Sequence, residues 1–268
     1  MTTGQSSIED VARTYARTAS DGFADTAQYL RSLPDEDWEG PTGCTEWTVR
    51  DLAGHIVGEA VWFPNLVEGV TKGGDLLPME LYEAMKSYPR DRIAHDIEDA
   101  AQDLWAAIDE ASTDQLNQPV DMGFTQIPIW RATFVSANEA VVHNWDARAG
   151  LDPSATIRPE WAVVMSRGMN EFAPLVASRE GISDAPGTYL LKVGDGVGPV
   201  TITARDRKLT VEFGSAGTPD VTLDLTADQF VRLIEGRLKI GDALERGDIT
   251  VEGDKARAAA LNEIFRGI

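Results

Sequence analysis

Apolar side chains recur every three or four positions in four stretches of the first 150 residues, which is the spacing of amphipathic helices. The stretches predict helices at about residues 8–33, 48–69, 92–112 and 130–149. Acids, prolines and glycines fill residues 33–47, which indicates a loop, and residues 69–90 are expected to form a connection with one short helix. Four helices of about 20 residues favour a bundle.

The pattern changes after Gly150. Short β-rich runs separated by turn residues predict strands at residues 188–193, 200–204, 208–213, 221–225 and 248–253. Helices are predicted at residues 159–178, 227–235, 240–245 and 254–265. The strand spacing favours an antiparallel sheet with hairpin connections. The sequence therefore predicts an α+β fold class, with a four-helix bundle at residues 1–152 and a small antiparallel-sheet α+β domain at residues 153–268.

Composition narrows the function classes. Hydrophobic residues make up 43% of the chain and charged residues 25%, which is ordinary for a globular protein. The net charge is −20, and the first 150 residues carry 10 basic against 26 acidic residues. Such a surface argues against nucleic acid and anionic membranes as partners, since both bind basic residues. No apolar run reaches about 20 residues and no secretory signal is visible, so a cytoplasmic location is expected.

The single cysteine, Cys44, cannot form an internal disulfide, which agrees with a reducing compartment. We interpret it as a small residue packed in the turn before the second helix, because no second cysteine or basic cluster stands beside it. A reactive thiol is the alternative.

The fourth predicted helix carries candidate chemistry. Glu139 and His143 lie four positions apart and thus on one face, where a carboxylate and an imidazole can bind one metal ion. An ordinary helical ion pair is the alternative, but these residues and Asp146 flank a wide apolar arc, where ionisable groups are costly unless paired or metal-bound. His55 borders the apolar stripe of the second helix and can supply a third ligand. His95 lies on the third predicted helix, opposite the apolar face of that helix, and is excluded as a ligand.

A His, His, Glu set leaves coordination open for an exogenous ligand, which makes a Lewis acid. The chain lacks the signatures of serine hydrolases, P-loop nucleotidases, HExxH zinc proteases and zinc ribbons. The glycine-rich GDGVGP lies between two predicted strands and is interpreted as a turn.

Two motifs carry a family resemblance. PTGCTEWTVRDLAGHIV (residues 41–57) resembles the W-T-V-R-D-L-x-x-H signature, and NEAVVHNWDARAG (residues 138–150) the E-x-x-x-H-x-W-D-x-A signature, of the mycothiol-dependent maleylpyruvate isomerase family. This family lies within the DinB-like metalloenzyme group. Residues 226–266 are similar to the small sterol-carrier-like domain that these proteins append. The resemblance implies a DinB-like bundle followed by a sterol-carrier-like α+β domain.

The resemblance also implies a divalent metal, usually zinc, held by His55, Glu139 and His143, with mycothiol as thiol cosubstrate. A coordinated thiol loses its proton, and the thiolate is the nucleophile. Asp146 and Arg148 could orient the ligands or recognise the thiol's sugar, although Asp146 could equally be a surface acid.

Arg237 matches an arginine common in the family's C-terminal domain. We hypothesise that it reaches across the domain gap to bind a substrate carboxylate, with a surface arginine as the alternative. The expected function is a zinc-dependent, mycothiol-using isomerase or S-transferase acting on a small electrophile. The alternatives are a carrier of small apolar molecules and a metal-dependent hydrolase that uses activated water. MGFTQIPIW, before the fourth helix, differs from many relatives and leaves the substrate open.

Overall fold

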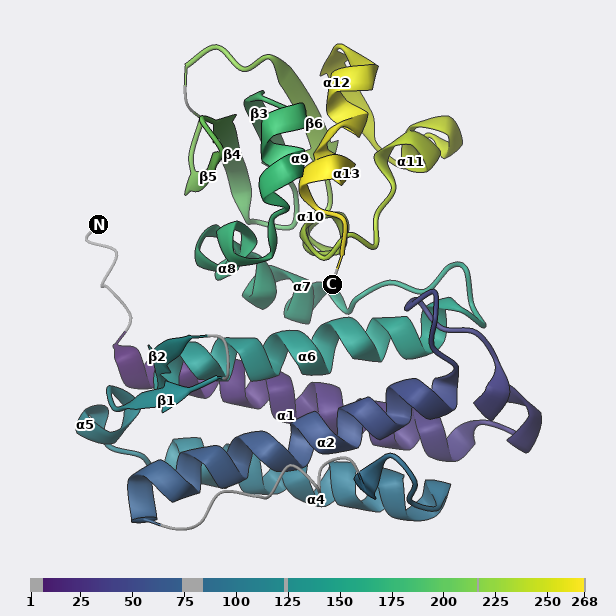
Figure 1. The fold of residues 1–268 in the computed structure, drawn as a ribbon, viewed down its shortest axis with the longest axis vertical. Helices are drawn as coiled ribbons and strands as arrows, with labels where there is room; N and C mark the ends of the chain where they lie inside the picture. Colours follow the sequence, from purple (N-terminus) through teal and green to yellow (C-terminus); the bar gives the residue numbers. More distant parts are fainter. Residues whose placement is uncertain (1–6, 74–83, 123–124, 216, 268) are drawn as a thin grey trace. The chain divides into compact units, whose positions relative to one another are not determined.

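The computed structural model describes residues 7–73, 84–122, 125–215 and 217–267. Contacts divide the chain into two compact units, Met1–Thr156 and Ile157–Ile268. Figure 1 draws the helices of the first unit and the sheet of the second.

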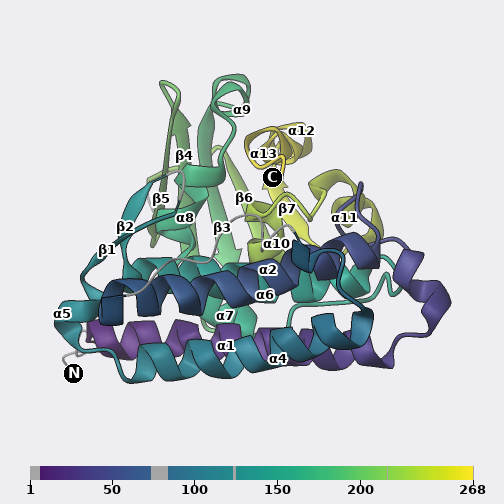
Figure 2. The same ribbon diagram turned by 60° about the horizontal axis from the view of Figure 1, so that its bottom comes forward.

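The first unit is built from four long helices that run side by side (Figure 2). They are α1 (Ile8–Ser32), α2 (Val49–Glu68), α4 (Arg90–Asp109) and α6 (Ile129–Ala149). α1 and α2 each pack against both α4 and α6, so the four close into a bundle. The predicted bundle is confirmed, and the helix ends agree with the predicted ones to within three residues.

Local sequence explains where the helices begin and which faces they bury. Ser7 with Asp10 and Thr48 with Asp51 form capping boxes at α1 and α2, in which each side chain bonds a backbone amide of the other residue. The predicted apolar stripe of α2 is buried throughout: Val49, Leu52, Ala53, Ile56, Val57, Ala60, Phe63 and Val67. α6 carries buried residues on nearly all sides, which is why its hydrophobic pattern looked broad.

The loop between α1 and α2 contains secondary structure that the sequence did not predict. The loop before α2 contains a 3₁₀ helix, η1 (Asp35–Glu39), whose Trp38 is buried. The guanidinium carbons of Arg50 and Arg90 lie 5.5 and 4.9 Å from its ring centroid, which ties the loop to the starts of α2 and α4.

The described residues of this unit also contain short elements. Among them are a π-helical turn at η2 (Gly69–Gly73), the helix α5 (Thr113–Leu116), and a hairpin of β1 (Pro119–Asp121) with β2 (Gln126–Pro128). The sequence predicts one short helix within residues 69–90, and residues 74–83 of that connection lie outside the described residues, as do residues 123–124 of MGFTQIPIW.

The second unit contains a five-stranded sheet in the order β5-β4-β3-β6-β7. Its strands are β3 (Gly187–Val193), β4 (Gly198–Arg205), β5 (Lys208–Phe213), β6 (Val221–Leu225) and β7 (Thr250–Gly253). β3-β4-β5 is a hairpin meander, and β6 pairs with β7 antiparallel. The prediction of an antiparallel sheet with hairpin connections holds for β3, β4 and β5, and it was wrong for β6, which pairs parallel with β3 and does not pair with β5. The α+β class is confirmed.

Seven helices accompany the sheet among the described residues. They are α7 (Pro159–Ser166), α8 (Met169–Val176), α9 (Arg179–Asp184), α10 (Ala227–Ile234), α11 (Ile240–Arg246), α12 (Lys255–Ala259) and α13 (Leu261–Ile264). α8 and α9 pack on β5, and α12 packs on β6 and β7. Within the described ranges, no helix combines the length and apolar character that a membrane crossing requires.

Two predicted helices were wrong as continuous elements. The helix expected at residues 159–178 is broken between α7 and α8, where Gly168, a poor helix former, lies. The closing helix expected at residues 254–265 is two short helices that meet at Ala260. Nothing in the local sequence explains that second break.

Candidate metal centre

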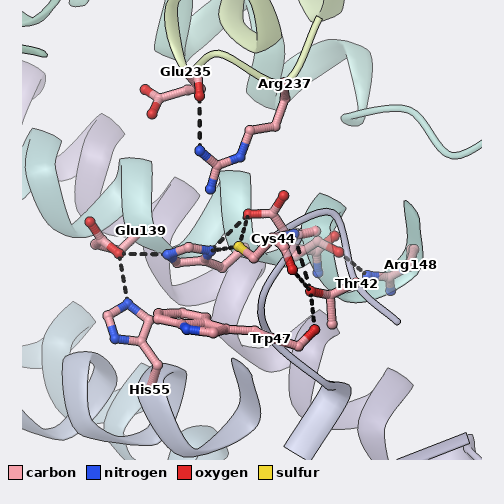
Figure 3. A network of polar contacts seen from close by, with 11 residues as sticks. Thr42, Cys44, Trp47, His55, Glu139, Arg148, Glu235 and Arg237 are labelled. Atoms are coloured by element: carbon pink, nitrogen blue, oxygen red, sulfur yellow. Dashed lines mark hydrogen bonds and ion pairs between the residues drawn. The ribbon is translucent and has the colours of Figure 1, made fainter. Parts of the chain in front are cut away.

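Two bundle helices bring three donor side chains together. His55 comes from α2, and Glu139 and His143 come from α6 one turn apart. Oε2 of Glu139 lies 3.3 Å from Nε2 of His55 and 3.1 Å from Nε2 of His143, and Figure 3 shows these contacts. The three predicted ligands therefore converge, although His55 lies 84 residues before Glu139 in the sequence.

The spacing of this trio suits a metal ion. Zinc binds nitrogen and oxygen ligands at about 2.0–2.2 Å, so neighbouring ligands of a tetrahedral ion lie about 3.3 Å apart. The donor atoms of His55, Glu139 and His143 all lie within 4.8 Å of one another. Their side chains are 22%, 28% and 12% exposed, so the trio is partly sheltered yet reachable. Three protein ligands leave an open position, as catalytic zinc sites do.

Asp146 contacts the ring of His143. Its Oδ2 lies 2.9 Å from Nδ1 of His143, and its side chain is 0% exposed, so it is not a helix-surface acid. A carboxylate that accepts from Nδ1–H fixes the ring and leaves the Nε2 lone pair for a metal, as carboxylate partners of metal-binding histidines commonly do.

Cys44 also reaches Asp146, which the sequence did not suggest. Its Sγ lies 3.2 Å from Oδ2 of Asp146 and 4.0 Å from Nδ1 of His143. The loop approaches α6 closely at Gly43, where an added Cβ would lie 2.3 Å from Oδ1 of Asp146. Cys44 stands in the same motif as His55, and that shared motif was the available signal.

Trp47 also lies beside the trio, and no pattern in the sequence pointed to it. Its ring centroid lies 5.0 Å from that of His55 and 6.2 Å from that of His143. The side chain is 36% exposed. The hydroxyl of Thr42 donates to the backbone carbonyls of Cys44 and Trp47, which holds the loop that carries both side chains.

The charges of the trio are strongly coupled. Burial lowers the pKa of His143, but hydrogen bonds to Asp146, Cys44 and Glu139 outweigh it and raise that pKa well above 6.5. Burial raises the pKa of Glu139, but its hydrogen bonds to His143 and His55 and the charges of these rings hold it well below 4.5. The raised pKa of His143 and the lowered pKa of Glu139 together favour a charged imidazolium–carboxylate pair between these two side chains.

Arg148 takes part in a network between α6 and α1. Its Nη2 lies 2.6 Å from Oδ2 of Asp25, and its guanidinium lies 4.3 Å from the ring centroid of Tyr29. Asn144 donates to the same Asp25 oxygen at 2.9 Å and to the hydroxyl of Thr26 at 2.9 Å. These contacts place Arg148 in a bundle-stabilising position.

Arg237 lies in the second unit and His95 in the first. Arg237 follows α10 in a turn with Gly236 at φ 72°, and its Nη1 donates to the carbonyl of Glu235 at 2.8 Å. His95 is exposed to solvent as expected: its side chain is 65% exposed and its Nε2 lies 3.4 Å from Oδ2 of Asp99.

Comparisons with known proteins bear on this centre. Residues 19–148 match the family described as the mycothiol maleylpyruvate isomerase N-terminal domain. The chain therefore carries a mycothiol maleylpyruvate isomerase N-terminal domain. All three ligand candidates lie inside this domain. Residues 170–266 match the SCP-2 sterol transfer family, so the resemblance found in the two motifs is confirmed for both parts.

Solved structures support the same fold. The crystal structure of the mycothiol-dependent maleylpyruvate isomerase is 17% identical and aligns with 87% of this chain and 93% of its own at a TM-score of 0.60. A mutant of that enzyme with a histidine replaced by alanine aligns over the same shares, at 17% identity and a TM-score of 0.58. At this identity the likeness establishes the fold. No curated protein matches the sequence.

Proposed function

We propose that this protein is a metal-dependent, mycothiol-using isomerase that acts on a small unsaturated electrophile. The observation that carries the proposal is the convergence of His55, Glu139 and His143 at ligand spacing inside an isomerase N-terminal domain. The solved isomerase of similar fold is described as mycothiol-dependent, which supports mycothiol as the cosubstrate here. Zinc is the proposed metal, since two imidazoles and one carboxylate with an open position suit it.

A divalent cation held by the trio would favour the thiolate form of a thiol that reaches its open position. His55 and His143 supply neutral nitrogens and Glu139 supplies charge. Asp146 keeps the proton of His143 on Nδ1, so that Nε2 stays an acceptor. The ring of Trp47 lies beside His55, with 5.0 Å between the ring centroids, and would bound one side of the space next to the metal.

The thiolate would add to a cis double bond conjugated to a carbonyl group. A carbon–sulfur bond forms, and the π pair moves to the carbonyl oxygen. Rotation about the new single bond and expulsion of the thiolate then give the trans isomer and return mycothiol unchanged. If the carbon–sulfur bond persists instead, the same site is an S-transferase, and product analysis separates the two outcomes.

The first test is elemental analysis combined with mycothiol titration. The wild type is expected to hold about one metal ion per chain and to bind mycothiol, whereas His55→Ala loses metal. His95→Ala is the matched control, because it removes an exposed histidine from the same bundle. A wild-type protein that holds no metal and binds no thiol would sink the proposal.

A carrier of apolar molecules is the competing function, and the SCP-2 match is the observation that favours it. A carrier would purify without stoichiometric metal and lose nothing on His143→Ala. A hydrolase would turn over an ester or amide without thiol, so strict dependence on added mycothiol would exclude it.

We extend the proposal to Arg237 as the group that binds a substrate carboxylate. A guanidinium holds a carboxylate through two parallel hydrogen bonds, which lysine cannot reproduce. Arg237→Lys and Arg237→Ala should therefore raise KM for a carboxylate substrate by about tenfold or more. Arg246→Ala, which removes an exposed arginine from the same unit, is the control. An unchanged KM would remove Arg237 from the site.

A further inference from the structure

One oxygen atom of Asp146 accepts from two distant segments of the bundle unit. Nδ1 of His143 lies 2.9 Å from Oδ2, and Sγ of Cys44, 102 residues away in sequence, lies 3.2 Å from the same atom. The carboxylate is fully buried. A buried carboxylate cannot be oriented by bulk water, so the protein groups around it decide where its oxygens point.

The loop before α2 is shaped to bring the thiol to this carboxylate. The backbone amide of Gly43 donates to the carbonyl of Asp146 at 2.8 Å, and no side chain fits at residue 43. Gly150, just after α6, is equally tight, since an added Cβ would lie 2.1 Å from the carbonyl of Pro41. The amide of Cys44 donates to the hydroxyl of Thr42 at 3.1 Å, which fixes the turn. These contacts hold Cys44 against α6.

We propose that Cys44 is a positioning residue of the metal centre: its thiol donates to Asp146 and fixes the carboxylate that orients His143. The chain of contacts runs from Cys44 Sγ–H to Asp146 Oδ2, and from there to Nδ1–H of His143. Nε2 of the same ring then faces Glu139 at 3.1 Å. This inference rests on the metal-binding part of the proposed function and adds a residue to it.

The other role for this thiol is direct metal binding. Donor atoms of Cys44, His143 and Asp146 also lie within 4.8 Å of one another, so they form a second group of ligand type. That group needs a lone pair on Nδ1 of His143, whereas the trio needs the lone pair on Nε2. A neutral imidazole carries one proton and one lone pair, so the ring serves one group at a time. The contact between Nδ1 and Asp146 favours the trio, which leaves Cys44 as a donor.

Infrared spectroscopy can test the thiol contact directly, because the chain has one cysteine and hence one S–H stretching band. In the metal-free protein the band is expected at lower frequency than in the unfolded chain, since hydrogen bonding weakens the S–H bond. Asp146→Asn should shift it back toward the unfolded position, because an amide oxygen accepts more weakly than a carboxylate. An S–H band that ignores Asp146→Asn in a protein of native circular dichroism would overturn the proposal.

Zinc addition separates the two roles of the thiol. A positioning thiol keeps its proton, so the S–H band should persist in the zinc-loaded protein. A thiolate ligand has no such proton, so loss of the band on zinc addition would overturn the proposal in favour of direct binding. A wild type that binds no zinc refutes the metal assignment, whereas the metal-free spectra still decide whether Cys44 contacts Asp146.

The matched pair Cys44→Ala and Cys44→Ser tests the consequence for the metal. Cys44→Ala should raise the zinc Kd by about tenfold, the cost of one hydrogen bond to a charged group. Cys44→Ser keeps a donor and should recover most of the affinity. Equal zinc affinities for Cys44→Ala and wild type would show that the thiol does not position Asp146.

Discussion

Asp146→Asn is expected to weaken zinc binding although it removes no atom that contacts the metal. The change keeps the shape of the side chain and replaces the carboxylate that faces Nδ1 of His143 at 2.9 Å with a neutral amide. The amide can also present its NH₂ group, which cannot accept the imidazole proton. His143 is then held less firmly with Nε2 toward Glu139.

The size of the effect follows from the burial of this contact. A hydrogen bond to a charged group contributes about 1.5–3 kcal/mol. Since about 1.4 kcal/mol is a factor of ten, the zinc Kd should rise by about 10- to 100-fold. Mutation of carboxylates behind metal-binding histidines in other proteins costs a similar factor.

The assay is competition for zinc against a chromophoric chelator, with circular dichroism as the check on folding. Asp99→Asn is the matched control, because Asp99 also faces a histidine, His95, but at 60% exposure on the surface of α4. Its zinc Kd should equal that of the wild type. If Asp146→Asn leaves the Kd within about twofold of wild type, the argument that Asp146 orients a ligand is refuted.

Three further outcomes are expected. Gly43→Ala should lower both the thermal stability and the zinc affinity, because its Cβ would lie 2.3 Å from Asp146. Arg148→Ala should lower the free energy of unfolding, measured with urea, by about 1–3 kcal/mol, because Asp25 loses a half-buried partner at 2.6 Å. Zinc affinity should rise with pH by about tenfold per unit below the pKa of His143, because that pKa is raised and zinc must displace a proton.

Each of these expectations has its contradicting result. If Gly43→Ala leaves the melting temperature and the zinc Kd unchanged, the loop before α2 can shift to make room for the added Cβ at little cost. Loss of mycothiol binding on Arg148→Ala with unchanged unfolding energy would assign Arg148 to the thiol instead of the bundle. For pH, calorimetry in buffers of different ionisation enthalpy should detect proton release on zinc binding near pH 7; a lowered pKa of His143 would predict none.

The spacing of apolar residues predicted most of the structure of the first unit. The stripe of α2 placed His55 at its border, and a spacing of four placed Glu139 and His143 on one face, so the trio followed from helix geometry and the family motifs. The exclusion of His95 followed from the same rule. The face on which each of these side chains lies could be predicted because, within one helix, distance along the sequence fixes direction.

Cys44 and Asp25 could not be found in this way. Cys44 meets Asp146 only because Gly43 and Gly150 let a loop lie against the end of α6, and Asp25 meets Arg148 only through the packing of α1 on α6. Such contacts depend on tertiary packing between distant segments, and the spacing of residues along the sequence does not predict them.

In the five-stranded sheet, too, the elements could be predicted from the sequence but their pairing could not. Each strand was visible from its β-branched residues, but the parallel pairing of β3 with β6 was not. Residue patterns within a strand report burial and turns, whereas the choice of partner depends on how the intervening segment crosses the sheet.

The trio joins helices whose contributing residues, His55 and Glu139, stand 84 positions apart. An ion held there is a reversible cross-link between α2 and α6, and it exists only in the folded chain. By mass action, free metal at about 100 times its Kd would add about 2.7 kcal/mol to the free energy of unfolding. Thermal unfolding in the presence of different divalent ions therefore ranks their affinities without any substrate, and the physiological ion can be sought before the reaction is known.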